Sequence, residues 1–87
     1  MKASEATGGT IDALTVLVDD ADIGLTTDDE KELKLPTGRH TFGAHAVGTP
    51  DAVCTVTLTS PGLTKPFKPV EVKTGAANRK ALRFALR

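Results

Sequence analysis

Cys54-Thr55-Val56-Thr57-Leu58 carries an apolar side chain at every second position, and this alternation decides the fold class. Successive side chains of a strand point to opposite faces, so such a segment buries one face and exposes the other. The same period recurs at residues 14–18, 70–72 and 82–86, and no segment shows a convincing helical period. The sequence therefore predicts an all-β protein.

Turn signals divide the chain into strands. The breaks fall at stretches rich in Asp, Gly or Pro, which favour turn geometry. The expected strands are 11–19, 23–26, 32–35, 39–47, 52–59, 67–73 and 79–86. This spacing predicts a single small antiparallel β-sandwich of about seven strands, with Greek-key or meander connections. One alternative is open, because residues 27–34 begin with a capping-box pattern that suits a short helix.

The length of 87 residues suits one domain. Residues 1–10 are small, polar and Gly-rich, which favours a flexible N-terminal arm ahead of a sandwich at 11–87. The N-terminus has no signal-peptide pattern, and no apolar run approaches the ~20 residues that span a bilayer. We therefore expect no direct membrane insertion. A full-length chain would be cytoplasmic, and a trimmed domain would be extracytoplasmic or on the cell surface.

Composition narrows the class of partner. Three Phe and no Trp or Tyr predict an aliphatic core and argue against stacking grooves for sugars or single-stranded nucleic acids. A formal net charge of zero argues against nucleic acid as the partner. The distribution is uneven, however, with −6 over residues 1–35 and +6 over 36–87. Either neighbouring strands neutralise each other, or the molecule has an acidic and a basic patch suited to association.

A cluster of carboxylates is the one candidate metal site in the sequence. Its members are Asp19, Asp20, Asp22, Asp28, Asp29 and Glu30. Calcium prefers oxygen ligands, but an EF-hand loop counted from Asp19 would place Ala21 and Ile23 at ligand positions. The favoured interpretation is a solvated acidic turn, and no metal or other cofactor is expected.

The histidines and the single cysteine offer no site for chemistry. His45 and Cys54 could form a thiol–imidazole pair across a hairpin that turns at 48–51. A shared apolar face requires a register with Ala46 opposite Cys54, which separates that pair. His40 is expected to be a strand-end residue with a solvent-exposed ring. Because no catalytic constellation is recognised, the sequence predicts a protein that is not an enzyme.

Basic residues gather near the C-terminus. The candidates for an interaction surface are Arg79, Lys80, Arg83 and Arg87. A competing interpretation is that these charges protect an exposed edge strand against aggregation.

The turns resemble those of a known family. Residues 16–26, VLVDDADIGLT, and 33–40, LKLPTGRH, resemble the PEGA-type domain, with its valine-rich strand, Asp-Gly hairpin and Leu-x-Pro-Gly-x-His step. Residues 61–75 are similar to its later turn and strand. The chain departs from the pattern at Asp20, Thr27 and Leu63, and residues 43–60 look like an inserted hairpin. An immunoglobulin-like or a carboxypeptidase-regulatory-like sandwich is the alternative.

The resemblance implies a non-catalytic surface or accessory module of a bacterial multidomain protein. Alternating strands without a reactive constellation favour a module for protein interaction, adhesion or spacing in a larger bacterial surface protein or assembly. We expect it to bind a protein partner through an exposed sheet edge or a charged loop end. Two alternatives are open. One is a homo-oligomer joined through the oppositely charged halves, and the other is a weak Ca²⁺ or small-ligand module that uses residues 19–30.

Overall fold

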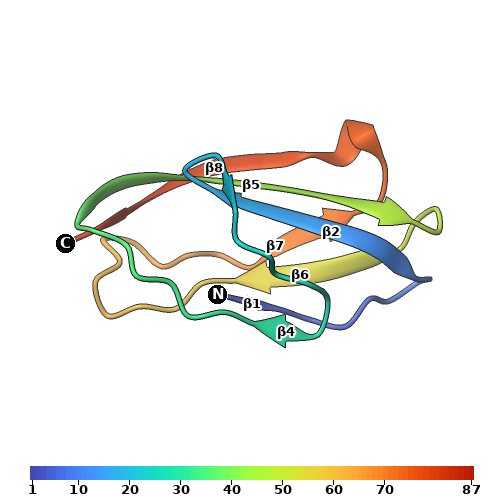
Figure 1. The fold of residues 1–87 in the computed structure, drawn as a ribbon, viewed down its shortest axis with the longest axis horizontal. Helices are drawn as coiled ribbons and strands as arrows, with labels where there is room; N and C mark the ends of the chain where they lie inside the picture. Colours follow the sequence, from blue (N-terminus) through green and yellow to red (C-terminus); the bar gives the residue numbers. More distant parts are fainter.

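Eight strands form two antiparallel sheets in the computed structural model, which describes residues 1–87 (Figure 1). Sheet A has the order β4-β1-β6-β7, and sheet B has the order β3-β2-β5-β8. The strands are β1 Lys2–Ala3, β2 Ile11–Val18, β3 Ala21–Asp22, β4 Asp29–Glu30, β5 Gly38–Gly48, β6 Val53–Thr57, β7 Val70–Lys73 and β8 Lys80–Leu86. The chain is all-β, as predicted. One 3-10 turn at Ala76–Asn78 is its only helical segment, so the helix left open at 27–34 does not form.

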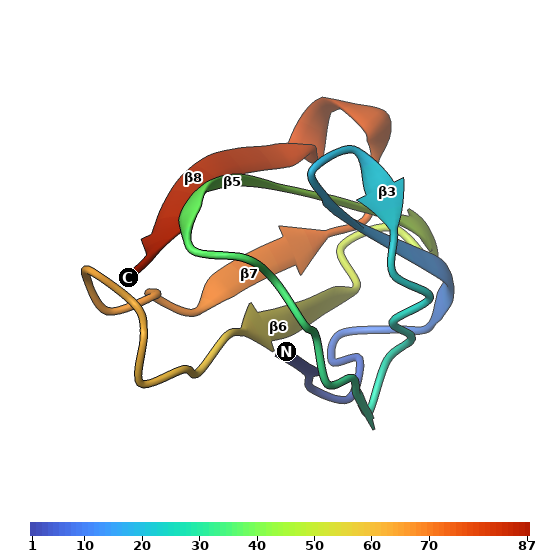
Figure 2. The same cartoon turned by 60° about the vertical axis from the view of Figure 1, so that its left-hand side comes forward.

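The two sheets lie as two layers with one core between them (Figures 1 and 2). β5 shows why the alternating pattern succeeds, because His40, Phe42, Ala44 and Ala46 are all buried while the residues between them are not. This alternating burial gives β5 a single inward face. In β6, Cys54 and Val56 are buried in the same alternating way.

The expected hairpin between β5 and β6 is wrong. β5 pairs with β2 and β8, whereas β6 pairs with β1 and β7. The turn at 48–51 instead carries the chain from sheet B to sheet A, so Ala46 and Cys54 contribute to one core from opposite layers. Alternating apolar residues identify the inward face of a strand, but they do not determine which other strand pairs with it.

The flexible arm expected at residues 1–10 is corrected by the structure. Lys2–Ala3 forms β1, which lies between β4 and β6 in sheet A. Met1 and Ala3 are buried, and the terminal ammonium of Met1 donates a hydrogen bond to the Lys31 carbonyl at 2.8 Å. The sequence gives no sign of this strand, because two paired residues are too few to show a strand period.

Two of the shorter expected strands are also corrected. Residues 32–35 form no strand, and the strand expected at 23–26 is replaced by β3 at Ala21–Asp22. Asp19 and Asp20 take positive φ values of 52° and 66°, which makes a tight turn and lets β3 begin immediately after it. Leu25 follows in an irregular segment, yet its side chain is only 1% exposed because it packs into the core.

The order of the strands in the two sheets differs from that of an immunoglobulin domain. In immunoglobulin domains the first two strands share a sheet, whereas β1 and β2 lie in different sheets here. The immunoglobulin-like type and the count of about seven strands are therefore not confirmed. The core itself is mostly aliphatic, as predicted, and includes the fully buried Val16, Val56 and Val72.

Candidate functional site

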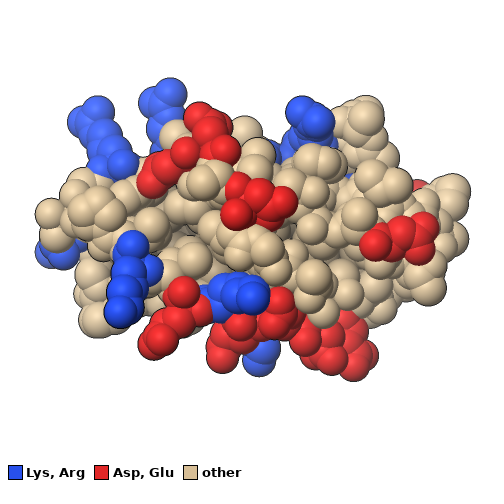
Figure 3. Space-filling view, in the orientation of Figure 1, with Lys and Arg blue, Asp and Glu red and all other residues tan.

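Strand order decides where the charges gather. β3 and β4 are end strands of the two sheets at one side of the sandwich, and β8 and β7 are the end strands at the other. Figure 3 shows the first side, where Asp and Glu atoms are spread over the face with a few lysines among them. Further Lys and Arg atoms project at its upper margin, above β5 and β8. Acidic residues therefore outnumber basic ones on this side of the sandwich.

The carboxylates on the acidic side are used by their own turns. Asp22 accepts a hydrogen bond from the Gly24 N–H at 2.9 Å. Asp29 accepts from the backbone N–H groups of Thr26 and Glu30, and these bonds hold its pKa below the usual value. No three His, Cys, Asp or Glu side chains come together in a way that could hold a metal ion. The six carboxylates named as a candidate calcium site are therefore not assembled into one site.

Asp19 and His40 form the only salt bridge in the structure. Nδ1 of His40 lies 2.6 Å from Oδ2 of Asp19, and Nε2 lies 2.8 Å from the Pro36 carbonyl oxygen. The Pro36 carbonyl and the ionised Asp19 carboxylate can only accept, so both ring nitrogens donate when the ring is protonated to an imidazolium. The hydrogen bond to Asp19, followed by that to Pro36, raises the pKa of His40. The same bond, with that from the Thr41 N–H, lowers the pKa of Asp19.

This ion pair corrects the expectation of a solvent-exposed ring at position 40. His40 is 5% exposed and stacks on Phe84, with ring centroids 5.3 Å apart. Its partner Asp19 comes from the tight turn after β2, whereas His40 is the third residue of β5. The pair therefore ties that turn to the core and has a structural role.

Cys54 and His45 lie apart, as the packing argument predicted, although for a different reason. Cys54 points into the core from sheet A, and burial raises the pKa of its thiol. His45 lies between the buried Ala44 and Ala46 on β5, so its ring belongs to the outer face of sheet B. The two side chains cannot act as a nucleophile and its base.

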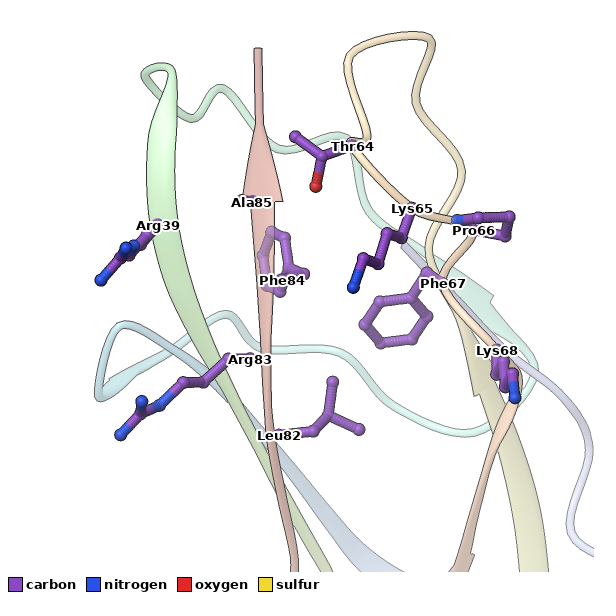
Figure 4. Close-up of a pocket in the computed structure, with 10 residues that line it drawn as sticks. All are labelled: Arg39, Thr64, Lys65, Pro66, Phe67, Lys68, Leu82, Arg83, Phe84 and Ala85. Carbon is purple, nitrogen blue, oxygen red and sulfur yellow. The ribbon is translucent and has the colours of Figure 1, made fainter.

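A groove lies on the basic side, between β8 and the loop at 64–68 (Figure 4). Its volume is about 500 Å³. Basic residues contribute Arg39, Lys65, Lys68 and Arg83, and apolar residues contribute Pro66, Phe67, Leu82, Phe84 and Ala85. The groove thus combines an apolar floor, four cations and a strand edge.

The floor of the groove is held by aromatic packing. The ring of Phe67 meets Phe42 and Phe84 edge to face, at centroid distances of 5.4 Å and 5.9 Å. Such geometry is favourable between aromatic rings and adds to the apolar area that they bury. Phe67 and Leu82 are only partly buried, so apolar surface remains accessible in the groove.

One edge of β8 is open along most of its length. On that edge the Ala85 carbonyl accepts from the Thr64 N–H at 3.1 Å, and the Arg87 N–H donates to the Gly62 carbonyl at 2.7 Å. These bonds occupy the C-terminal end of the edge. Because β8 pairs with β5 alone, the backbone groups on the free side from Lys80 to Arg83 have no strand partner.

The predicted interaction residues do not form one cluster. Arg83 lines both the groove and a second hollow over Gly43, whereas Arg79 and Lys80 line only that hollow. The guanidinium of Arg87 instead donates to the Thr64 carbonyl at 3.4 Å. Sequence reasoning missed the groove residues Arg39, Lys65, Phe67 and Lys68. The only signal for them in the sequence is the excess of positive charge over residues 36–87. That excess indicates a basic stretch of chain, but it does not show which of its residues meet on one surface.

Comparison with protein families, with curated proteins and with solved structures finds no match to this chain. None of its helical segments has the length and apolar character needed to cross a membrane.

Proposed function

We propose that this chain is a non-catalytic β-sandwich module that binds a protein partner through the open edge of β8. The observation that carries the proposal is the free edge from Lys80 to Arg83 beside an apolar groove. An exposed edge presents unpaired N–H and C=O groups to which an extended peptide can add as another strand. Backbone hydrogen bonds then supply affinity, and the groove supplies selectivity.

The charged side chains on this edge fit the same proposal. Arg83 is exposed on β8, where a charge opposes pairing between identical edges. The two interpretations of the basic C-terminus are therefore compatible, since a cation that repels another basic edge also selects an acidic partner. The resemblance of residues 16–26 and 33–40 to PEGA-type domains supports a setting in a bacterial surface protein or assembly.

Selection of peptides on the immobilised protein tests the proposal. Ala85 presents its carbonyl to the free edge, and alternate residues of a strand face the same side, so the N–H of Ala81 also faces that edge. Ala81→Pro removes this donor without touching the bonds to β5. Peptides enriched from a random displayed library are expected to bind the wild type and to lose binding to Ala81→Pro.

Glu71→Pro is the matched control, because it removes an outward N–H from the neighbouring edge strand β7, outside the groove. Melting temperatures are measured first, and Arg83→Pro replaces Ala81→Pro should that variant unfold. A library that yields no binders, or binders that are indifferent to the proline on β8, would overturn the proposal.

A second candidate is a homo-oligomer, and the separation of acidic and basic sides favours it. A head-to-tail contact would bring β8 of one copy against the acidic side of the next. Sedimentation equilibrium at low and high salt tests this candidate, because exposed charges are screened beyond ~10 Å at 0.1 M salt. Self-association that weakens with salt would support it, and a monomer under both conditions would refute it.

A further inference from the structure

The cations around the groove have no acidic partner within the chain. Arg39, Lys65, Lys68 and Arg83 are all exposed, and the single salt bridge of the structure is elsewhere, between Asp19 and His40. Four uncompensated positive charges around an apolar floor attract a partner that carries both negative charge and apolar groups.

We propose that the groove takes an extended segment of a partner protein in which acidic and apolar residues alternate. The inference rests on the proposed function, to which it adds the chemistry of the partner. The alternation follows from the two faces of sheet B at β8. A strand added beside β8 would extend the sheet, so its side chains would point alternately to the outer and the inner face.

The outer side of β8 is basic. Arg83 lies opposite Thr41, and Ala85 lies opposite Arg39, so both arginines belong to the outer face of sheet B. Figure 4 shows their side chains pointing away from Phe84 and Leu82. Every second side chain of an added strand would lie near these arginines, where a carboxylate forms a favourable cross-strand pair and a basic residue is repelled.

The inner side of β8 is apolar. Leu82 and Phe84 point toward Phe67, as Figure 4 shows, and the loop residues Lys65 and Lys68 flank that ring. The intervening side chains of an added strand would lie over Leu82 and Phe67, which are partly buried already. An apolar side chain there removes further apolar surface from water.

The open stretch also limits the length of the segment. The bonds from Thr64 and Arg87 close the edge at its C-terminal end, so the free backbone runs from Lys80 to Arg83. A segment of about four or five residues spans this stretch at ~3.3 Å per residue. We expect two acidic positions and two apolar positions within it.

The test uses the peptides selected on the wild-type protein, with their sequences read and their affinities measured for two variants. Arg83→Glu reverses a groove charge, and Lys34→Glu makes the same change at an exposed lysine outside the groove. We expect acidic residues at alternate positions of the selected peptides. Arg83→Glu should weaken their binding at least about fivefold, and Lys34→Glu should change it less than about twofold.

Salt provides the second readout, because the Debye length falls from ~10 Å at 0.1 M to ~3 Å at 1 M. Binding that weakens over this range supports the inference. Selected peptides that depend on the N–H of Ala81 but are neutral, or that ignore Arg83→Glu, would overturn the inference and leave the proposed function standing. Self-association that Arg83→Glu abolishes would identify a second copy of the chain as the occupant and would overturn the peptide proposal.

Discussion

His40 donates a hydrogen bond of 2.6 Å from Nδ1 to Oδ2 of Asp19, and the two residues stand 21 positions apart in the chain. The pair joins the turn after β2 to the start of β5, where the imidazolium is 5% exposed. The second N–H of the His40 ring, at Nε2, donates to the Pro36 carbonyl oxygen. The same ring therefore also holds the segment that leads into β5. A buried and fully hydrogen-bonded charge of this kind makes the stability of the fold depend on pH.

The first prediction concerns that pH dependence. The pKa of His40 is raised in the folded protein, so its stabilisation is complete below the ordinary value of about 6.5 and is lost as the pH rises through the raised pKa. The pKa of Asp19 is lowered, so its contribution is complete above 3.8 and is lost as the pH falls through the lowered pKa. The free energy of unfolding, measured with urea across this range, should be greatest between the two limits.

His40→Gln removes the titrating ring and should flatten the alkaline side of that profile. His45→Gln is the control, since the ring of His45 lies on the outer face of sheet B, outside the ion pair. An unchanged alkaline decline in His40→Gln would contradict the assignment of an imidazolium.

The second prediction concerns the core. Leu25 is 1% exposed although it belongs to no strand, and Leu25→Ala should lower the free energy of unfolding by about 2–5 kcal/mol. That loss rivals the whole stability of a domain of this size, so the variant should be largely unfolded. Val47 is 59% exposed, and Val47→Ala should change stability by less than about 0.5 kcal/mol. Equal effects in thermal melts would show that Leu25 does not pack as described.

The third prediction concerns the close approach of two chain segments at Gly48. A Cβ at this position would lie 2.3 Å from the Thr10 carbonyl oxygen, so Gly48→Ala must displace backbone. We expect a destabilisation of about 1–3 kcal/mol. Gly43 lies on the same strand, and a Cβ there would have no neighbour closer than 3.8 Å. Gly43→Ala should therefore fold with stability within about 1 kcal/mol of the wild type, and chemical denaturation of both variants distinguishes the two sites.

The fourth prediction concerns the thiol of Cys54. Its side chain is 2% exposed and burial raises its pKa, so the reactive thiolate is scarce in the folded protein. Reaction with a thiol reagent should proceed only as fast as the protein opens, and it should accelerate steeply when urea is added. A native protein that reacts as fast as the unfolded chain would contradict the placement of Cys54 in the core.

The longer strands of this fold were predictable, and the reason is physical. β2, β5, β6 and β8 each bury one face, so their alternating apolar residues identify both the strand and its inward side. β1, β3 and β4 have two residues each, which is too short for any period to appear. The sheet to which a strand belongs depends on packing between distant segments, and this is why β5 and β6 were wrongly paired.

The candidate site was predictable only in part for the same reason. Arg83 could be found because basic residues crowd the last strand. Arg39, Phe67 and Arg83 lie far apart in the sequence, and only the strand order brings them to one groove. The ion pair of Asp19 with His40 was missed because the turn after β2 was read as solvated.

The central claim is that the open edge of β8 binds an extended partner segment, and amide hydrogen exchange measures this directly. In the free protein the N–H groups of Ala81 and Arg83 have no strand partner and should exchange quickly. When a peptide selected on the protein is bound, the account predicts slow exchange at these two amides. Unchanged exchange there, with protection at β3 or β4 instead, would contradict the account.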